Sequence, residues 1–183
     1  MLFRSLDGTA NFVHGFPAVG VSIALARGGR PVVGVVHAPF LGETYLAVSG
    51  GGATVERADG TEPLRVSDRP LARAIVTTGL PFRRRDALPR FLETFERVFG
   101  AIEDIRRPGA AALDLAWVAS GVFEGYFELG LAPWDVAAGG LIVECAGGEF
   151  WWQPVDGDYA VEICVNNGKL RPQLQAESAK SRA

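Results

Sequence analysis

Two pairs of apolar segments joined by glycine turns constrain the fold of this chain most. Residues 18–39, AVGVSIALARGGRPVVGVVHAP, read as two apolar strands around the turn Arg27-Gly28-Gly29-Arg30, a pattern typical of a β-hairpin. Residues 43–56, ETYLAVSGGGATVE, repeat the arrangement around three glycines. Because consecutive hairpins pair side by side, the first third of the chain predicts an antiparallel sheet.

The rest of the chain changes character and alternates short apolar strands with helices. Phe91, Phe95, Val98 and Phe99 recur at helical spacing within residues 86–100, and Gly100 follows them. The other predicted helices cover residues 110–121 and 133–148, and the predicted strands lie within residues 73–82, 102–109, 122–129, 149–152 and 161–167. This mixture predicts a layered α/β (α+β) fold rather than a doubly wound nucleotide-binding sheet. No linker divides it, so we expect one domain over residues 1–170 and a polar tail over residues 171–183.

Composition narrows the classes of function. Of the 183 residues, 48% are hydrophobic, which is enough for a substantial core, and the formal net charge is −3. A chain without a surplus of clustered cations is not built to wrap nucleic acid or an anionic membrane. The start MLFRSL is too short for a signal peptide, and no apolar run is long enough to span a bilayer. We therefore expect a cytoplasmic protein with no nucleic-acid or membrane partner.

The tripeptide Asp7-Gly8-Thr9 is the first candidate site. If residues 9–15 begin a helical turn, free backbone N–H groups face the preceding loop, where an anion could bind. Gly8 would allow close backbone approach, the Thr9 hydroxyl would cap the turn or orient a water, and Asp7 offers an oxygen of the kind that Mg²⁺ prefers. Taken alone, the same tripeptide is more often a plain turn with a capping threonine.

Two further carboxylates and a run of arginines can each be interpreted either as part of a site or as a residue without a function in binding. Asp135 falls in the first turn of a predicted helix, where the dipole favours a carboxylate without any function. Residues 137–140, Ala-Ala-Gly-Gly, indicate that this helix packs closely against another layer. Glu128 ends a predicted strand and either points toward the same cleft as Asp135 or lies in solvent. Residues 83–85, three arginines, could attract an anionic substrate, but a solvated loop is the favoured interpretation.

Taken together, these segments resemble the inositol monophosphatase family of magnesium-dependent phosphatases. The resemblance is carried in order by LDGTANFVHGFPAVGVSIAL, by GVVHAPFLGETYLAVSGGGA and by RRPGAAALDLAWVASGVFEGYFELGLAPWDVAAGGLIVECAGG, and it runs from about Leu6 to Asn167. Ala10 follows the D-G-T, where the nucleotide and histidinol-phosphate branches of the wider superfamily usually carry a lysine. The sequence is therefore more similar to the inositol monophosphatase branch.

The resemblance implies a five-layer α-β-α-β-α sandwich, here lacking its N-terminal elements. It implies Mg²⁺ as cofactor, hydrolysis of a phosphate monoester by a metal-activated water, a small phosphorylated polyol as substrate, and a homodimer as an open option. By motif, the metal ligands would be Asp7, the Leu6 carbonyl and Asp135. Asp7 and Thr9 would be the catalytic residues, with the Thr9 hydroxyl helping to orient the water. Substrate binding would fall to Gly8, Thr9, Gly109, Ala110, Ala111, Glu128 and Asp135.

One departure from the family motif bears directly on the metal. The family signature is D-P-x-D-G-T, and here the same six positions hold Arg4-Ser5-Leu6-Asp7-Gly8-Thr9, so a cation stands where a metal-binding aspartate is expected. The family's front segment, with a G-E-E stretch, also has no counterpart after Met1. We therefore expect impaired Mg²⁺-dependent hydrolysis and an exposed apolar sheet face. The alternative function is a non-catalytic remnant that binds phosphate or a partner chain without turnover. The two explanations for the departure are an N-terminally truncated copy and a genuine degenerate member.

Overall fold

The computed structural model describes residues 1–82, 84–155 and 161–170, so the predicted tail lies outside the described residues. The first sheet is antiparallel, and its strands follow one another in chain order. They are β1 (Leu2–Asp7), β2 (Gly20–Arg27), β3 (Arg30–Ala38), β4 (Glu43–Val48), β5 (Gly52–Arg57) and β6 (Gly60–Pro63). Both predicted hairpins are confirmed. The sequence did not predict β1 and β6, which add one strand at each edge.

The second sheet is mixed, with the order β10-β11-β9-β7-β8. Its strands are β7 (Ile75–Thr78), β8 (Asp104–Arg106), β9 (Gly125–Leu131), β10 (Glu149–Pro154) and β11 (Val161–Asn166). The helices are α1 (Thr9–Val13), α2 (Leu88–Phe99), α3 (Ala111–Ala119) and α4 (Pro133–Cys145), with 3₁₀ turns at Leu71–Arg73 and Arg85–Ala87. Within the described part of the chain, no helix is long and apolar enough to cross a membrane.

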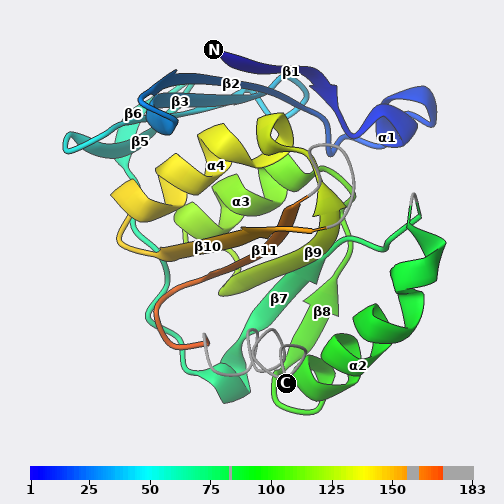
Figure 1. Cartoon of the computed structure of the whole chain (residues 1–183). Helices are drawn as coiled ribbons and strands as arrows, with labels where there is room; N and C mark the ends of the chain where they lie inside the picture. Colours follow the sequence, from blue (N-terminus) through cyan, green and yellow to red (C-terminus); the bar gives the residue numbers. More distant parts are fainter. Residues whose placement is uncertain (83, 156–160, 171–183) are drawn as a thin grey trace.

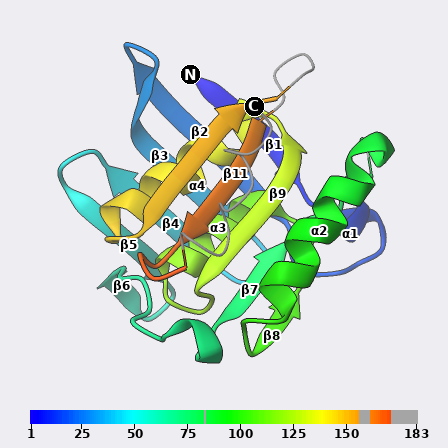
Figure 2. The ribbon, with the colours of Figure 1, turned by 60° about the horizontal axis from the view of Figure 1, so that its bottom comes forward.

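The elements stack in four layers (Figure 1). The first sheet covers one side of α3 and α4, the second sheet covers the other side, and α2 lies on the far face of the second sheet (Figure 2). Phe91 of α2 stacks on Phe127 of β9 with ring centroids 5.8 Å apart, which fixes the helix on that face. The layered α/β fold predicted from the sequence is confirmed, and the described residues form a β-α-β-α part of the expected sandwich.

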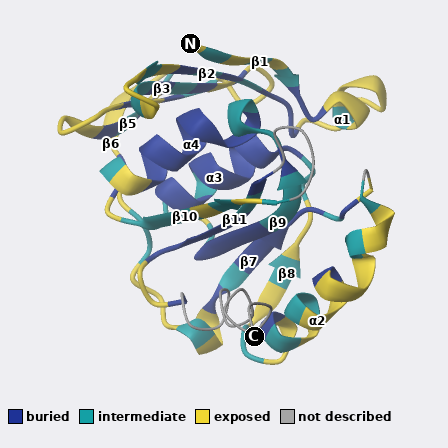
Figure 3. Cartoon of the chain, in the orientation of Figure 1, coloured by how far each residue is buried: buried dark blue, intermediate teal, exposed yellow. Residues whose placement is uncertain are grey.

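The helix layer is buried almost completely because it packs on both sides (Figure 3). Small residues in α4 allow this close packing, as the run 137–140 predicted. A Cβ added to Gly139 would come within 2.6 Å of the Leu115 side chain of α3. A Cβ added to Gly140 would come within 2.7 Å of the Phe150 ring of β10. Larger residues at either position would push α4 away from its neighbours.

The outer face of the first sheet carries an apolar row. Phe3 pairs with Ile23, Ile23 with Val35, and Val35 with Leu46, so the four side chains lie side by side across β1 to β4. Phe3 is 52% exposed and Leu46 is 41% exposed, because α3 and α4 pack on the opposite face. The exposed apolar sheet face that we expected is therefore present in the described residues.

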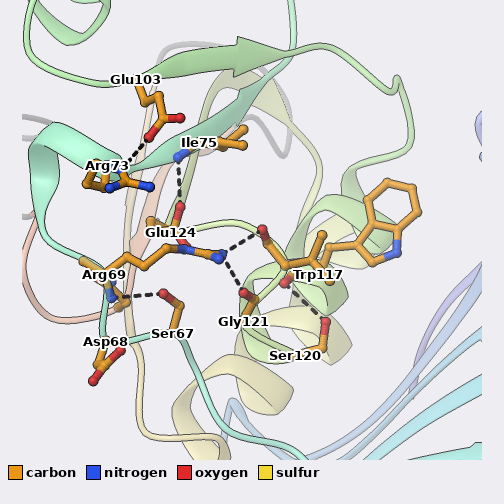
Figure 4. Close-up of polar contacts among 12 residues, drawn as sticks. Ser67, Asp68, Arg69, Arg73, Ile75, Glu103, Trp117, Ser120, Gly121 and Glu124 are labelled. Carbon is orange, nitrogen blue, oxygen red and sulfur yellow. Dashed lines mark hydrogen bonds and ion pairs between the residues drawn. The ribbon is translucent and has the colours of Figure 1, made fainter.

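An ion pair between the exposed Arg69 and the buried Glu124 ties the connection between the two sheets to the start of β9 (Figure 4). Arg69 Nε donates to Glu124 Oε1 at 2.6 Å, and Glu124 Oε2 accepts the Ile75 backbone N–H at 2.7 Å. Arg69 Nη2 also donates to the carbonyls of Gly121 and Val122 at 2.8 and 3.0 Å. Because Glu124 is fully buried, its charge depends on these partners.

Candidate functional site

A cavity of about 210 Å³ opens where the end of β1 meets the carboxyl end of β9 and the first turn of α4. These elements come from distant parts of the chain and lie at one end of the layered core (Figure 1). Seven residues predicted from the sequence share its wall: Asp7, Gly8, Thr9, Gly109, Ala111, Glu128 and Asp135. Leu6 and Ala110 are not among the wall residues, and Ala110 is only 1% exposed.

Asp7 is held at the N-terminus of α3. Its Oδ2 accepts the Ala112 backbone N–H at 2.8 Å, and its Oδ1 accepts the Gly8 N–H at 3.0 Å. Burial raises the pKa of the Asp7 carboxyl, although these two backbone donors oppose the shift. Both carboxylate oxygens therefore have protein partners, and Asp7 acts as a helix cap as well as a wall of the cavity.

Asp135 repeats this arrangement at the start of α4. Its Oδ2 accepts the Ala132 N–H at 3.0 Å, so the helix-start interpretation of this residue is confirmed. The same side chain lines the cavity and is 4% exposed. Asp135 thus carries both roles that the sequence left open: it caps a helix and faces the pocket.

Arg4 lies between these two carboxylates. Residues three apart in a regular strand point to opposite faces, but Arg4 pairs with Ser22 while Asp7 pairs with Gly20. One extra residue on β1 forms a bulge that turns both side chains toward the helix layer. Arg4 Nε lies 3.1 Å from Asp135 Oδ1, and Arg4 Nη2 lies 3.9 Å from Asp7 Oδ1.

This arrangement does not fit a resident Mg²⁺ ion. A guanidinium that pairs with both predicted carboxylate ligands adds a positive charge where the ion would need negative ones. The described residues contain no group of three or more His, Cys, Asp or Glu side chains that could hold a metal. The Leu6 carbonyl accepts the Thr9 hydroxyl at 3.4 Å. Of the predicted ligands, two carboxylates are therefore tied to Arg4 and the carbonyl is tied to Thr9.

Glu128 faces the cavity from β9 and lies across Gly79. A Cβ at Gly79 would come within 2.4 Å of both carboxylate oxygens of Glu128, so only glycine leaves room for this side chain. The Tyr126 hydroxyl donates to Glu128 Oε2. Burial raises the pKa of Glu128 to about 7, with the Tyr126 hydrogen bond opposing the shift. The sequence interpretation of Glu128 as a solvated strand end is therefore wrong.

The Gly8-Thr9 segment has the predicted turn but not the predicted cap. Gly8 occupies the N-cap position of α1 with φ of 75°, a left-handed conformation that favours glycine. A side-chain cap is absent from α1 in the described structure, since the Thr9 hydroxyl donates to the Leu6 carbonyl instead. With only five residues, α1 is too short for its own dipole to form an anion site.

Sequence reasoning missed two residues that shape this cavity, Asn11 and Arg107. Asn11 Nδ2 donates to the carbonyls of Ala18 and Pro108, both at 2.8 Å, and so ties the D-G-T loop to the loop before α3. Arg107 lines the wall, and its guanidinium carbon lies 5.2 Å from the centre of the Phe82 ring. Arg84, from the predicted solvated loop, also lines the wall. Both Asn11 and Arg107 lie within the segments that carry the family resemblance, TANF and RRPG.

The described residues define the class of layered α/β proteins, with a small cavity lined by arginines, carboxylates and glycine turns. This class agrees with the comparison with known families. The family model described as the inositol monophosphatase family matches residues 6–175. The chain belongs to the inositol monophosphatase family.

Individual relatives carry two kinds of name. An inositol-1-monophosphatase of Mesorhizobium japonicum is 43% identical over 144 residues, covering 78% of this chain and 53% of the relative. The Nus factor SuhB of Pasteurella multocida is 46% identical over 144 residues, covering 78% of this chain and 52% of the relative. The solved structure of Mycobacterium tuberculosis SuhB superposes with a TM-score of 0.86 at 34% identity, covering 96% of this chain and 69% of that chain. The chain thus spans about half the length of these curated relatives.

Proposed function

We propose that the cavity binds a small phosphorylated polyol such as inositol monophosphate, and that Mg²⁺-dependent hydrolysis of its phosphate ester is impaired in this chain. The observation that carries the proposal is the convergence of seven predicted residues, from four separate segments, on one small cavity. A volume of about 210 Å³ is at the small end for a ligand site and suits a compact polar ligand.

Different residues of the cavity would contact the phosphate and the polyol parts of the ligand. Gly8 and Thr9 would face the phosphate, where the Gly8 N–H and the Thr9 hydroxyl would exchange their present acceptors, Asp7 Oδ1 and the Leu6 carbonyl, for phosphate oxygens. The Gly109–Ala111 backbone would line the polyol side. Glu128 accepts hydrogen bonds from ligand hydroxyls when it is ionised. With one oxygen held by Tyr126, its carboxyl group has a fixed orientation for this contact.

Arg4 is the reason for the proposed impairment. In the family that this chain resembles, Mg²⁺ supplies an activated water and neutralises the charge that develops on the phosphate. Arg4 can neutralise charge in the same place. A guanidinium cannot make water nucleophilic, because it does not coordinate a water molecule and lower its pKa as a metal ion does. We therefore expect binding to survive better than turnover.

The second candidate is the non-catalytic one: binding of phosphate or a partner chain without turnover. Two observations favour it, the ion pairs of Arg4 with both carboxylates and the 46% identity to a relative named as a Nus factor. The homodimer stays a prediction.

Release of inorganic phosphate from myo-inositol 1-phosphate separates the two candidates. The purified chain is assayed with Mg²⁺ beside an Asp135→Asn variant of matched folding. Slow release that Asp135→Asn abolishes supports an impaired phosphatase. Release no faster than from the variant assigns the chain to the non-catalytic class.

A further inference from the structure

We propose that Arg4 is a built-in cation of the cavity, so that the site captures a phosphate monoester dianion through arginine side chains without a divalent metal. This inference rests on the proposed function of the cavity as a phosphate-ester site. It concerns which groups neutralise the ligand, and it starts from the disagreement between the Arg4 ion pairs and a resident Mg²⁺.

The position of Arg4 is built into the strand. The bulge between Arg4 and Asp7 turns the guanidinium toward the helix layer, where Asp135 is nearly fully buried. The two contacts differ in length, 3.1 Å to Asp135 and 3.9 Å to Asp7, so Arg4 leans toward α4. Two helix starts and two carboxylates thus surround one guanidinium.

Unused hydrogen-bonding capacity marks this place as a binding site. Arg4 Nε and Asp135 Oδ1 are both buried, and neither completes a hydrogen bond with any described residue, although the two atoms are within ion-pair distance. A buried charged group that lacks a well-directed partner is costly. A guanidinium also carries five N–H donors, more than two carboxylate contacts use. A phosphate in the cavity would accept the remaining donors.

A second arginine reaches the same cavity from the other side. Arg107 precedes α3, and its Nη1 atom lies 2.7 Å from the point that a Cβ of Gly109 would occupy. Gly109 therefore leaves space for the Arg107 guanidinium, which the Phe82 ring supports. Planar guanidinium forks match phosphate oxygens in pairs, so Arg4 and Arg107 could share one dianion.

Isothermal titration calorimetry tests the inference with two probes, inorganic phosphate and myo-inositol 1-phosphate. Each probe is titrated into the full chain once in EDTA and once in excess Mg²⁺. We expect binding in EDTA with the same affinity as in Mg²⁺. Tighter binding of the polyol phosphate than of inorganic phosphate identifies an ester as the ligand, and equal binding identifies the free anion.

Two variants and one control test which arginines neutralise the bound phosphate. Arg4→Met and Arg107→Met should each weaken binding in EDTA by about 10- to 100-fold, the range expected for a lost charged hydrogen bond. Arg73→Met, at an exposed arginine outside the cavity, should leave binding unchanged. Circular dichroism checks that each variant is folded. If Arg4→Met does not fold, the binding measured for Arg107→Met decides the test.

Two results overturn the inference while leaving the proposed function in place. One is binding that appears only with Mg²⁺, and the other is binding in EDTA that survives both arginine substitutions. No binding of either probe by the folded chain, with or without Mg²⁺, overturns the proposed function and this inference together.

Discussion

Arg4 Nε lies 3.1 Å from Asp135 Oδ1, which joins the first strand of the chain to the first turn of α4. Arg4→Met should leave Asp135 and Asp7 without their shared cation. We expect this change to lower the free energy of unfolding by about 2 kcal/mol, since Arg4 is partly exposed and solvent screens the loss. Urea denaturation measures the change. In an Asp135→Asn background the same substitution should cost clearly less, and equal costs in the two backgrounds would show that the pair does not interact.

Asn11 holds two loops together, so its substitution should destabilise both loops. Asn11→Ala removes the hydrogen bonds to Ala18 and Pro108 and leaves two carbonyls without their donor. We expect a loss of about 1–3 kcal/mol in the free energy of unfolding. Hydrogen exchange should rise in residues 8–18 and in residues 107–110 together. A rise confined to one of the two segments would contradict the proposal that Asn11 links the two loops.

The Arg69–Glu124 pair should matter far more than an exposed pair nearby. Arg69→Ala leaves the Glu124 charge buried, so we expect a loss of about 3 kcal/mol in the free energy of unfolding. Arg73→Ala breaks a solvent-exposed pair with Glu103 and serves as the matched control with little expected effect. Chemical denaturation of the two variants in parallel makes the comparison. Similar losses for both would contradict the special role given to the buried Glu124 carboxylate.

The buried carboxyl of Glu128 predicts how stability depends on pH. Its pKa in the folded chain is about 7, above the ordinary value of 4.5, so the folded state holds the proton more tightly than the unfolded state. Its contribution to stability is therefore full below pH 4.5, falls as pH rises toward 7, and is lost above 7. Over that window the loss is on the order of 3 kcal/mol.

Glu128→Gln should remove this part of the pH dependence. The difference in unfolding free energy between the parent and Glu128→Gln, measured by denaturant titration from pH 5 to 8, should fall as pH rises. A difference that stays flat would contradict the shifted pKa. The difference reports Glu128 together with the charged and titratable groups that face it, because removing its charge also removes its interactions with them: Asp7, Arg107, Asp114, Tyr126 and Asp135.

The sequence predicted most of the architecture because its local signals agree with the tertiary contacts. The hairpin around Arg27–Arg30 and the helix starting at Pro133 carry their own turn and start signals. The strand β1 carries no such signal, because its pairing depends on β2 and its bulge exists only in that pairing. For the same reason, the sequence showed that Arg4 replaces an aspartate but not that its side chain turns toward Asp135.

The candidate site came from the resemblance rather than from spacing. Asp7, Glu128 and Asp135 are far apart in the chain, and only the family pattern suggested that Asp7 meets the other two. Their local roles were partly readable, since a carboxylate in a first helical turn is a common cap. The contributions of Gly79 and Asn11 depend on neighbours from other elements, a carboxyl group in one case and two carbonyls in the other.

Direct binding of Mg²⁺ in the absence of phosphate tests the central claim that Arg4 stands in the place of a metal. Calorimetric titration of MgCl₂ compares the parent chain with Arg4→Asp, which restores the carboxylate of the family motif. We expect Arg4→Asp to bind Mg²⁺ about tenfold more tightly than the parent chain or more, the effect of exchanging a nearby cation for an anion. Equal Mg²⁺ affinity in the two proteins would contradict the account.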